Sequence, residues 1–539
     1  MRPLDRSELA AVAARVAVRA LARPRPLARR GRALLYELAE IARGRSTRAP
    51  APADRRFGDP AFAQHPAYRR LMQSYLALRE ALLAIVDEVE LDEASRARGR
   101  FALTLVVEAL APTNTLAGNP AALKRAFDTG ARSLGRGVVN LMRDLRHHGG
   151  LPSQVDRRAF SVGGNLAVSP GEVVFRNEVL ELIQYAPATA SVYERPLVMI
   201  PPQINKYYVL DLAPGRSLVE YAVRQGLQVF AVSWRNPTAA QRDWGLATYV
   251  RALVDATDAV REICGSERLG VLGACAGGIT TAILCGHLAA RGDQRVASAT
   301  FPVTVLDTSV PSTIGLFASE RSIARAMARA RDRGLLPGRE LARTFAWLRP
   351  NDLVWSYWVN NYLLGADPPA FDILYWNNDY TNLPATLYAE FCEIFISNSM
   401  CRPGAVAVLD TPIDLGRVQA DVYAIGASTD HLTPWRACYR TPGLFGGERT
   451  FVESTNGHIQ AIVNPVGNVK AGYVIGDGWE PDVERWLQRA QERKGSWWPH
   501  WAAWIAARSG GQRAAPARLG SDAHPPILPA PGRYVHQHA

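Results

Sequence analysis

The chain has 539 residues, a formal net charge of +12 and 48% hydrophobic residues, which suits a large enzyme or more than one domain. No apolar run approaches the roughly 18–20 residues of a membrane span, and Arg15 and Arg19 interrupt the only stretch that could be a signal peptide. Six scattered cysteines without a C-x-x-C pair argue against a zinc cage or a disulfide framework, and the positive charge comes without a nucleic-acid-binding motif, so an anionic substrate or surface explains it equally well.

Residues 1–56 form a basic segment rich in Arg and Ala. Apolar residues at helical spacing predict a first amphipathic helix, which Pro24 and Pro26 end: Leu9, Val12, Val16 and Leu21. A second helical pattern covers Leu34–Ile41, and residues 46–53 have the composition of a linker. Two interpretations stay open for this segment, namely an arm that binds a surface or a partly disordered tail.

Residues 57–160 are predicted to form an all-helical N-terminal domain. Their apolar side chains recur every three or four residues, beginning with Tyr68, Leu71, Tyr75, Leu78 and Leu82. Asn119 followed by Pro120 is a helix-start signal. Gly149 and Gly150 end the helical pattern.

Residues 161–307 and 411–505 predict an α/β core, because short apolar strands alternate there with amphipathic helices. The predicted strands are residues 173–175, 179–185, 196–200, 228–234, 269–272, 298–306, 418–425 and 449–452. Residues 308–410 interrupt this alternation with helical patterns and many aromatic residues, which predicts a lid insertion or, more simply, a second small core. The Ala-, Pro- and Arg-rich residues 506–539 are predicted to be a disordered tail.

The stretch Arg268–Thr280 organises the core. A strand signal runs into Gly273-Ala274-Cys275-Ala276-Gly277-Gly278, and a helical pattern follows. This is the layout of a nucleophile elbow with Cys in place of Ser. The helix that starts after Cys275 favours a thiolate there, and the amide of Ala276 is placed to stabilise an oxyanion. The alternative is a buried structural thiol in a strand–helix turn.

A nucleophilic thiol needs a base and a group that orients the base, and in this fold the order along the chain is nucleophile, acid, histidine. Asp430 follows the strand that ends at Ile425, and His458 follows the strand Arg449–Val452. Asp430 and His458 are therefore the predicted acid and base.

Several other residues are weaker candidates for these roles. His431 is the rival base, although a neighbour of Asp430 in sequence rarely bonds productively with it. His287 falls inside the elbow helix and His500 is close to the tail. Asp410 and Asp414 are rival acids whose simpler role is in turns or caps.

From about Arg56 to Trp504 the sequence resembles the class I polyhydroxyalkanoate synthases. The similarity rests on the G-x-C-x-G-G box together with several other passages: Gly150–Asp156, Pro201–Leu212, Arg349–Leu364, Tyr375–Asp379, Asp430–Trp435 and Gly457–Pro465. Gln203 departs from the pattern, since Trp or Cys is expected in P-P-x-I-N-K. The resemblance implies an α/β-hydrolase core in which Cys275 is acylated, His458 is the base and Asp430 is the third member.

The resemblance also implies the activity, which is polymerisation of 3-hydroxyacyl-coenzyme A with no cofactor and no metal. Expected partners are the surface of cytoplasmic polyester granules and a second copy in a homodimer, without nucleic acid or a membrane span. A thioester on Cys275 keeps the acyl group activated, and Ala276 with Ile204 would supply the oxyanion hole. Asp430 would orient His458 or help to deprotonate the incoming 3-hydroxyl. Two alternatives stay open: a thioesterase or depolymerase on the same fold, and a non-enzymatic granule scaffold.

Overall fold

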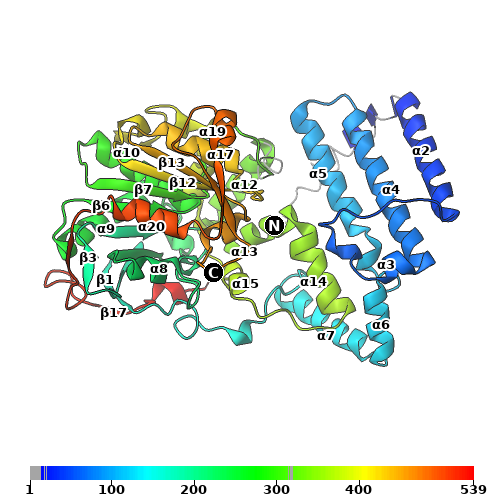
Figure 1. Cartoon of the computed structure of the whole chain (residues 1–539), viewed down its shortest axis with the longest axis horizontal. Helices are drawn as coiled ribbons and strands as arrows, with labels where there is room; N and C mark the ends of the chain where they lie inside the picture. The colour runs from blue at the N-terminus through cyan, green and yellow to red at the C-terminus, as the bar shows by residue number, and fades with distance from the viewer. Residues whose placement is uncertain are drawn as a thin grey trace. The chain divides into compact units, whose positions relative to one another are not determined.

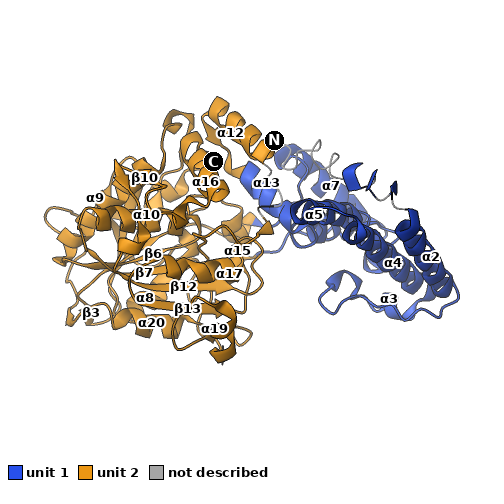
Figure 2. Cartoon of the chain, turned by 90° about the horizontal axis from the view of Figure 1, so that it is seen from above, with its two compact units in different colours: residues 1–156, 340–370 blue, residues 157–339, 371–539 orange. Residues whose placement is uncertain are grey.

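The computed structural model describes residues 14–16, 18–19, 21–22, 24–313, 315 and 320–538. Leu9 and Val12, which were predicted to belong to the first helix, lie outside the described residues. The chain divides into two compact units (Figure 2). Unit 1 comprises residues 1–156 and 340–370, and unit 2 comprises residues 157–339 and 371–539.

Unit 1 is helical, as the sequence predicts. Its helices are α2 (Pro24–Ala42), α3 (Ala61–Gln64), α4 (Pro66–Glu88), α5 (Glu93–Ala109), α6 (Pro120–Asp128), α7 (Arg132–His147) and α14 (Ser356–Trp358), while α13 (Gly338–Leu348) crosses the boundary. Helices α2, α4 and α5 lie side by side (Figure 1). Pro24 and Pro26 stand in the first turn of α2, where a missing N–H costs no hydrogen bond. The segment predicted as an arm thus packs, from residue 24 onward, as part of the helical unit.

The predicted lid of residues 308–410 is divided between the two units. Residues 340–370 pack with the N-terminal helices, because the hydroxyl of Tyr362 donates a 2.7 Å hydrogen bond to buried Asp144 of α7. At Gly137 of α7 a Cβ atom would stand only 1.9 Å from the carbonyl oxygen of Tyr362, so glycine permits this close contact. The remaining parts, residues 308–339 and 371–410, belong to unit 2. Among their elements are α12 (Glu320–Arg333), α15 (Asp372–Asn377) and α16 (Ala385–Ser397).

Unit 2 is built on an eleven-stranded sheet with the order β15-β14-β13-β12-β7-β6-β4-β5-β2-β1-β17. The six central strands are parallel: β5 (Val229–Trp234), β4 (Leu197–Ile200), β6 (Leu269–Gly273), β7 (Val296–Pro302), β12 (Asp421–Ala427) and β13 (Arg449–Ser454). The flanking strands are antiparallel: β1 (Gly171–Arg176), β2 (Leu180–Tyr185), β14 (Gly472–Ile475), β15 (Gln491–Lys494) and β17 (Leu528–Pro529).

Helices cover both faces of this sheet. Figure 2 shows α9 (Leu246–Cys264) and α10 (Ala276–Ala290) on one side of the strands, and α8 (Leu218–Arg224) and α20 (Trp498–Ala506) on the other. The parallel strands β4, β5, β6 and β7 are buried along their whole length, which is why they are continuous apolar runs in the sequence. Their carboxyl ends meet at one edge, where loops can bring side chains together.

The prediction of a disordered tail, made for residues 506–539, is wrong for residues 506–538. β16 (Gln512–Ala514) pairs with β3 (Ser191–Tyr193), and β17 pairs with β1. Tyr534 and Val535 are buried, and the amide of Tyr534 donates a 2.8 Å hydrogen bond to the buried carboxylate of Glu181. The segment has few apolar residues, but its backbone completes hydrogen bonds at sheet edges, which composition does not reveal. No helix in the described parts of the chain is long and apolar enough to cross a membrane.

Candidate active site

Cys275 stands at the turn between β6 and α10. Its backbone has φ 51° and ψ −121°, a conformation that is strained for a residue with a side chain and that is common at functional turns. The amide of Cys275 donates a 3.0 Å hydrogen bond to the carbonyl of Pro302, which holds the turn. Gly277 lets α10 approach β4, since a Cβ there would lie 2.5 Å from the carbonyl oxygen of Pro201. The predicted elbow geometry is therefore present at Cys275.

His458 and Asp430 lie together on the next two loops along the sheet. β12 leads to Asp430, and β13 leads to His458 at the start of α18 (His458–Ile462). Nδ1 of His458 is 2.6 Å from Oδ2 of Asp430. The side chain of Asp430 is fully buried, and that of His458 is 9% exposed. The short distance and the burial fix the orientation of the imidazole ring.

The side chain of Cys275 also acts on the imidazole of His458, since it contributes to the raised pKa of that ring. Because Nδ1 is taken by Asp430, Nε2 is the nitrogen left for the sulfur. Burial lowers the pKa of His458, but the charges of Asp430 and Cys275 outweigh this effect and hold that pKa well above its ordinary value. Burial opposes ionisation of Asp430, yet the charge and hydrogen bond of His458 keep its pKa below the ordinary value. The structure brings together the three residues predicted from the sequence, in an arrangement suited to a charged imidazole.

Thr433 completes this cluster, and the sequence reasoning did not single it out. Its hydroxyl donates a 2.6 Å hydrogen bond to Oδ2 of Asp430 and lies 3.1 Å from Nδ1 of His458. The backbone amides of Leu432 and Thr433 donate to Oδ1 at 2.8 and 3.1 Å. The carboxylate of Asp430 thus accepts four hydrogen bonds. A hydroxyl three residues after an acidic residue is a common local turn, so only the structure shows that Thr433 reaches the imidazole.

Two backbone amides near the elbow are free to donate. The amide of Ala276 is the first of α10 and has no acceptor within the described residues, and the same holds for the amide of Ile204. Ile204 lies in the loop after β4, next to β6 in the sheet, and its carbonyl accepts a 3.1 Å hydrogen bond from the amide of Thr381. Both amides therefore stay candidates for an oxyanion hole.

The rival residues have other positions. His287 lies buried within α10, and Nδ1 of His500 is 2.9 Å from the hydroxyl of Tyr423. Asp414 accepts a hydrogen bond from the amide of Gly416 as a helix cap, and Asp410 sits in a turn with φ 57°. His431 follows Asp430 in the same loop and is partly exposed.

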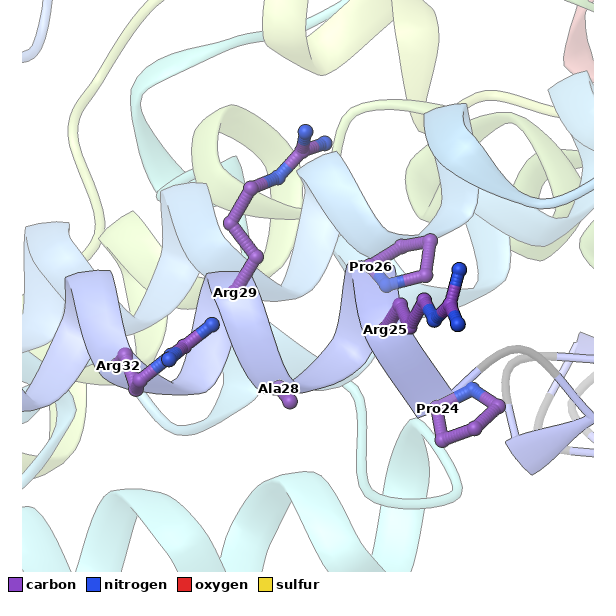
Figure 3. A pocket seen from close by; sticks show the side chains of 6 residues that line it. All are labelled: Pro24, Arg25, Pro26, Ala28, Arg29 and Arg32. Carbon is purple, nitrogen blue, oxygen red and sulfur yellow. The ribbon is translucent and has the colours of Figure 1, made fainter.

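A pocket that is separate from the site around Cys275 lies at the start of α2. It is lined by Pro24, Arg25, Pro26, Ala28, Arg29 and Arg32 (Figure 3). Its lining residues include no thiol, imidazole or carboxylate, and it belongs to unit 1, so it shares none of the groups of the site around Cys275. Among the described residues, no group of three His, Cys, Asp or Glu side chains could hold a metal ion.

The sheet order, the elbow and the loop positions of Asp430 and His458 together define the α/β-hydrolase class. A family model described as the alpha/beta hydrolase fold matches residues 196–465, in agreement with this assignment. The predicted core architecture is confirmed.

A second family model, described as the N-terminus of poly-beta-hydroxybutyrate polymerase (PhaC), matches residues 53–222. The chain is 50% identical over 501 residues to poly(3-hydroxyalkanoate) polymerase 1 of Ectopseudomonas oleovorans, which covers 93% of this chain and 89% of that protein. It is 41% identical over 502 residues to the poly(3-hydroxyalkanoate) polymerase subunit PhaC of Cupriavidus necator, covering 92% and 85%. The chain belongs to the poly(3-hydroxyalkanoate) polymerase family and is an enzyme of the acyltransferase type. The resemblance noted in the sequence is confirmed.

Proposed function

We propose that the protein polymerises (R)-3-hydroxyacyl-coenzyme A into polyhydroxyalkanoate, with Cys275 carrying the acyl chain as a thioester. The observation that carries this proposal is the imidazole of His458, which Asp430 orients and whose pKa the side chain of Cys275 at the elbow helps to raise. The names of the relatives support the substrate class. The coenzyme A thioester is itself the activated substrate, so the reaction requires neither a cofactor nor a metal.

In the first step, the thiol proton of Cys275 passes to Nε2 of His458 as the sulfur attacks the thioester carbonyl. The amides of Ala276 and Ile204 donate hydrogen bonds to the oxyanion that forms. The carbon–sulfur bond to coenzyme A then breaks, and His458 returns the proton to the leaving thiolate. One thioester replaces another, so this step is close to neutral in free energy.

In the second step, a 3-hydroxyl group attacks the acyl–Cys275 thioester and forms an oxygen ester. His458, or Asp430 acting on the hydroxyl, removes the proton of the alcohol, and the sulfur of Cys275 leaves. The exchange of a thioester for an oxygen ester is downhill, and this drives chain growth. A serine at position 275 would exchange one oxygen ester for another and lose this driving force.

The proposal includes the place of action, which is the surface of cytoplasmic polyester granules, with the enzyme as a homodimer. Support for granule binding comes from exposed apolar side chains of α6 and α7: Phe127, Val138, Val139, Met142 and Leu145. Phe127 is 88% exposed, and such a patch suits an apolar polymer. Replacing Phe127 and Met142 by Glu is expected to reduce co-sedimentation with granules without affecting turnover of soluble substrate.

The test uses purified enzyme and 3-hydroxybutyryl-coenzyme A, with coenzyme A release and turbidity recorded together. The wild type is expected to give both signals, and Cys275→Ala is expected to give neither. Coenzyme A release that yields only free 3-hydroxybutyrate would indicate a thioesterase instead. Polymerisation by Cys275→Ala at the wild-type rate would exclude Cys275 as the nucleophile.

A further inference from the structure

The loop after β4 supplies few backbone donors. Its first two residues are Pro201 and Pro202, which have no N–H, and the carbonyl of Pro201 accepts a 2.9 Å hydrogen bond from the indole of Trp234. The first amides that can donate are therefore those of Gln203 and Ile204. Any oxyanion donor from this loop depends on how residues 203–204 are placed against α10.

The side chain of Gln203 connects this loop to the elbow helix. Gln203 is 1% exposed, and its Nε2 donates a 2.9 Å hydrogen bond to Oγ1 of Thr280, which is fully buried. Thr280 lies one helical turn after Ala276, and its Oγ1 is 3.5 Å from the carbonyl oxygen of Ala276. The contact thus joins the loop that carries Ile204 to the helical turn that begins with Ala276.

The other end of the loop is fixed independently. The carbonyl of Ile204 accepts from the amide of Thr381, and the carbonyl of Lys206 accepts a 2.7 Å hydrogen bond from the indole of Trp376. These contacts hold the loop to residues 376–381, while the side-chain hydrogen bond of Gln203 joins it to α10.

The buried carboxamide of Gln203 stabilises the fold less than an apolar side chain would. Within the described residues, Oε1 of Gln203 has no hydrogen-bond partner, although the atom is buried. Burying an unsatisfied polar atom costs stability, whereas an apolar side chain of the same length would fill the space without that cost. Packing alone therefore does not account for glutamine at this position, whereas a directional hydrogen bond to Thr280 does.

We propose that Gln203 is a positioning residue for acyl transfer, because its hydrogen bond to Thr280 sets the separation between the amides of Ile204 and Ala276. The residue acts through these amides and does not touch the substrate. The inference rests on the proposed function and adds to it the residue that aligns the two halves of the oxyanion hole.

The test is a double-mutant cycle on the hydrogen bond, read as kcat and KM for coenzyme A release from 3-hydroxybutyryl-coenzyme A. Gln203→Met keeps the length of the side chain and removes the amide, and Thr280→Val keeps its shape and removes the hydroxyl. Each change is expected to lower kcat by about 10- to 100-fold with KM within about threefold, since a displaced oxyanion donor acts mainly on the transition state. The double variant is expected to be no slower than the slower single variant. Thr280→Ser, which keeps the hydroxyl, is expected to retain most of the activity.

Gln228→Met is the matched control. Gln228 is also buried and donates a 2.7 Å hydrogen bond through Nε2 to the carbonyl of Tyr193, but it precedes β5 at the opposite end of the parallel strands from the elbow. This variant is expected to lose thermal stability with kcat unchanged. The inference is overturned if Gln203→Met and Thr280→Val keep kcat within twofold of the wild type, or if their losses multiply in the double variant. Thr280→Val tests the same bond from the other side should Gln203→Met fold poorly.

The outcomes separate this inference from the function on which it rests. An inactive Cys275→Ala beside a fully active Gln203→Met would refute the role of Gln203 and leave the proposed reaction standing. A wild type that releases no coenzyme A would instead refute the proposed reaction itself.

Discussion

Nδ1 of His458 lies 2.6 Å from Oδ2 of Asp430, although the two residues are 28 positions apart in the sequence. The two residues follow β12 and β13, which are adjacent and parallel in the sheet. Parallel neighbours end at the same edge, so the topology itself brings these two side chains together. Cys275 follows β6, which is parallel to these strands, so its thiol lies at the same edge of the sheet.

The first prediction concerns the choice of base. His458→Gln is expected to lower the rate of acylation of Cys275 by about 10²–10⁴-fold, the range that a general base contributes. His431→Gln is expected to lower it by less than about tenfold, because the ion pair with Asp430 that orients a base is made by His458. Single-turnover acylation followed by mass spectrometry distinguishes the two variants. A larger loss in His431→Gln would show that the base is misassigned.

The second prediction concerns Thr433 and pH. The hydrogen bonds from His458 and Thr433 help to lower the pKa of Asp430 against the effect of burial. A carboxyl group with a lowered pKa stabilises the native state above its unfolded-state pKa, and this contribution is lost as the pH falls through the native value. Thr433→Val removes one of these hydrogen bonds, so the pKa of Asp430 is expected to rise. The acidic limb of the pH–rate profile should then move to higher pH, and kcat should fall about three- to tenfold. Thr433→Ser should follow the wild-type profile, and an unshifted limb in Thr433→Val would contradict this role.

The third prediction concerns Glu453 of β13. Burial raises the pKa of this carboxyl to about 7, and the charge of Arg436 offsets only part of the effect. A carboxyl group with a raised native pKa contributes its full stability below the unfolded-state value and loses it as the pH rises toward 7. The glutamine of Glu453→Gln cannot ionise. At pH 8 the free energy of unfolding of this variant is therefore expected to be about 1–3 kcal/mol higher than that of the wild type, and at pH 4.5 the two values should be nearly equal. Thermal melts of both proteins across this range provide the measurement, and parallel curves would refute the assignment.

The fourth prediction concerns the C-terminal segment. Ending the chain after Pro526 removes β17, the buried side chains of Tyr534 and Val535, and two 2.8 Å backbone hydrogen bonds to Glu181. The loss is expected to cost at least about 3 kcal/mol, since Glu181 stays buried with fewer donors. Tyr534→Phe removes only the hydrogen bond to the carbonyl of Asn177 and should cost about 1 kcal/mol. Equal melting temperatures for the truncated and full-length proteins would show that the segment adds nothing.

Short-range patterns in the sequence were sufficient to predict the α/β core and the positions of Cys275, Asp430 and His458 in it. The elbow at Cys275 was predictable because a strand, a strained turn and a helix require small residues at fixed positions, and the order of Asp430 and His458 followed from where loops leave parallel strands. The helical character of unit 1 was likewise visible as a three- and four-residue period.

Other features depend on partners far apart in the sequence. The division of residues 308–410 between the units depends on Tyr362 reaching Asp144, 218 positions away. The C-terminal segment is ordered because it pairs with a sheet edge. The parts proposed for Thr433 and Gln203 depend on hydrogen bonds to side chains of α18 and α10. Local spacing in the sequence thus determined the elements and the elbow at Cys275, because those are set by neighbouring residues. Only the tertiary structure decided which distant surfaces are buried and which polar groups meet, because burial and hydrogen bonding are properties of the folded arrangement.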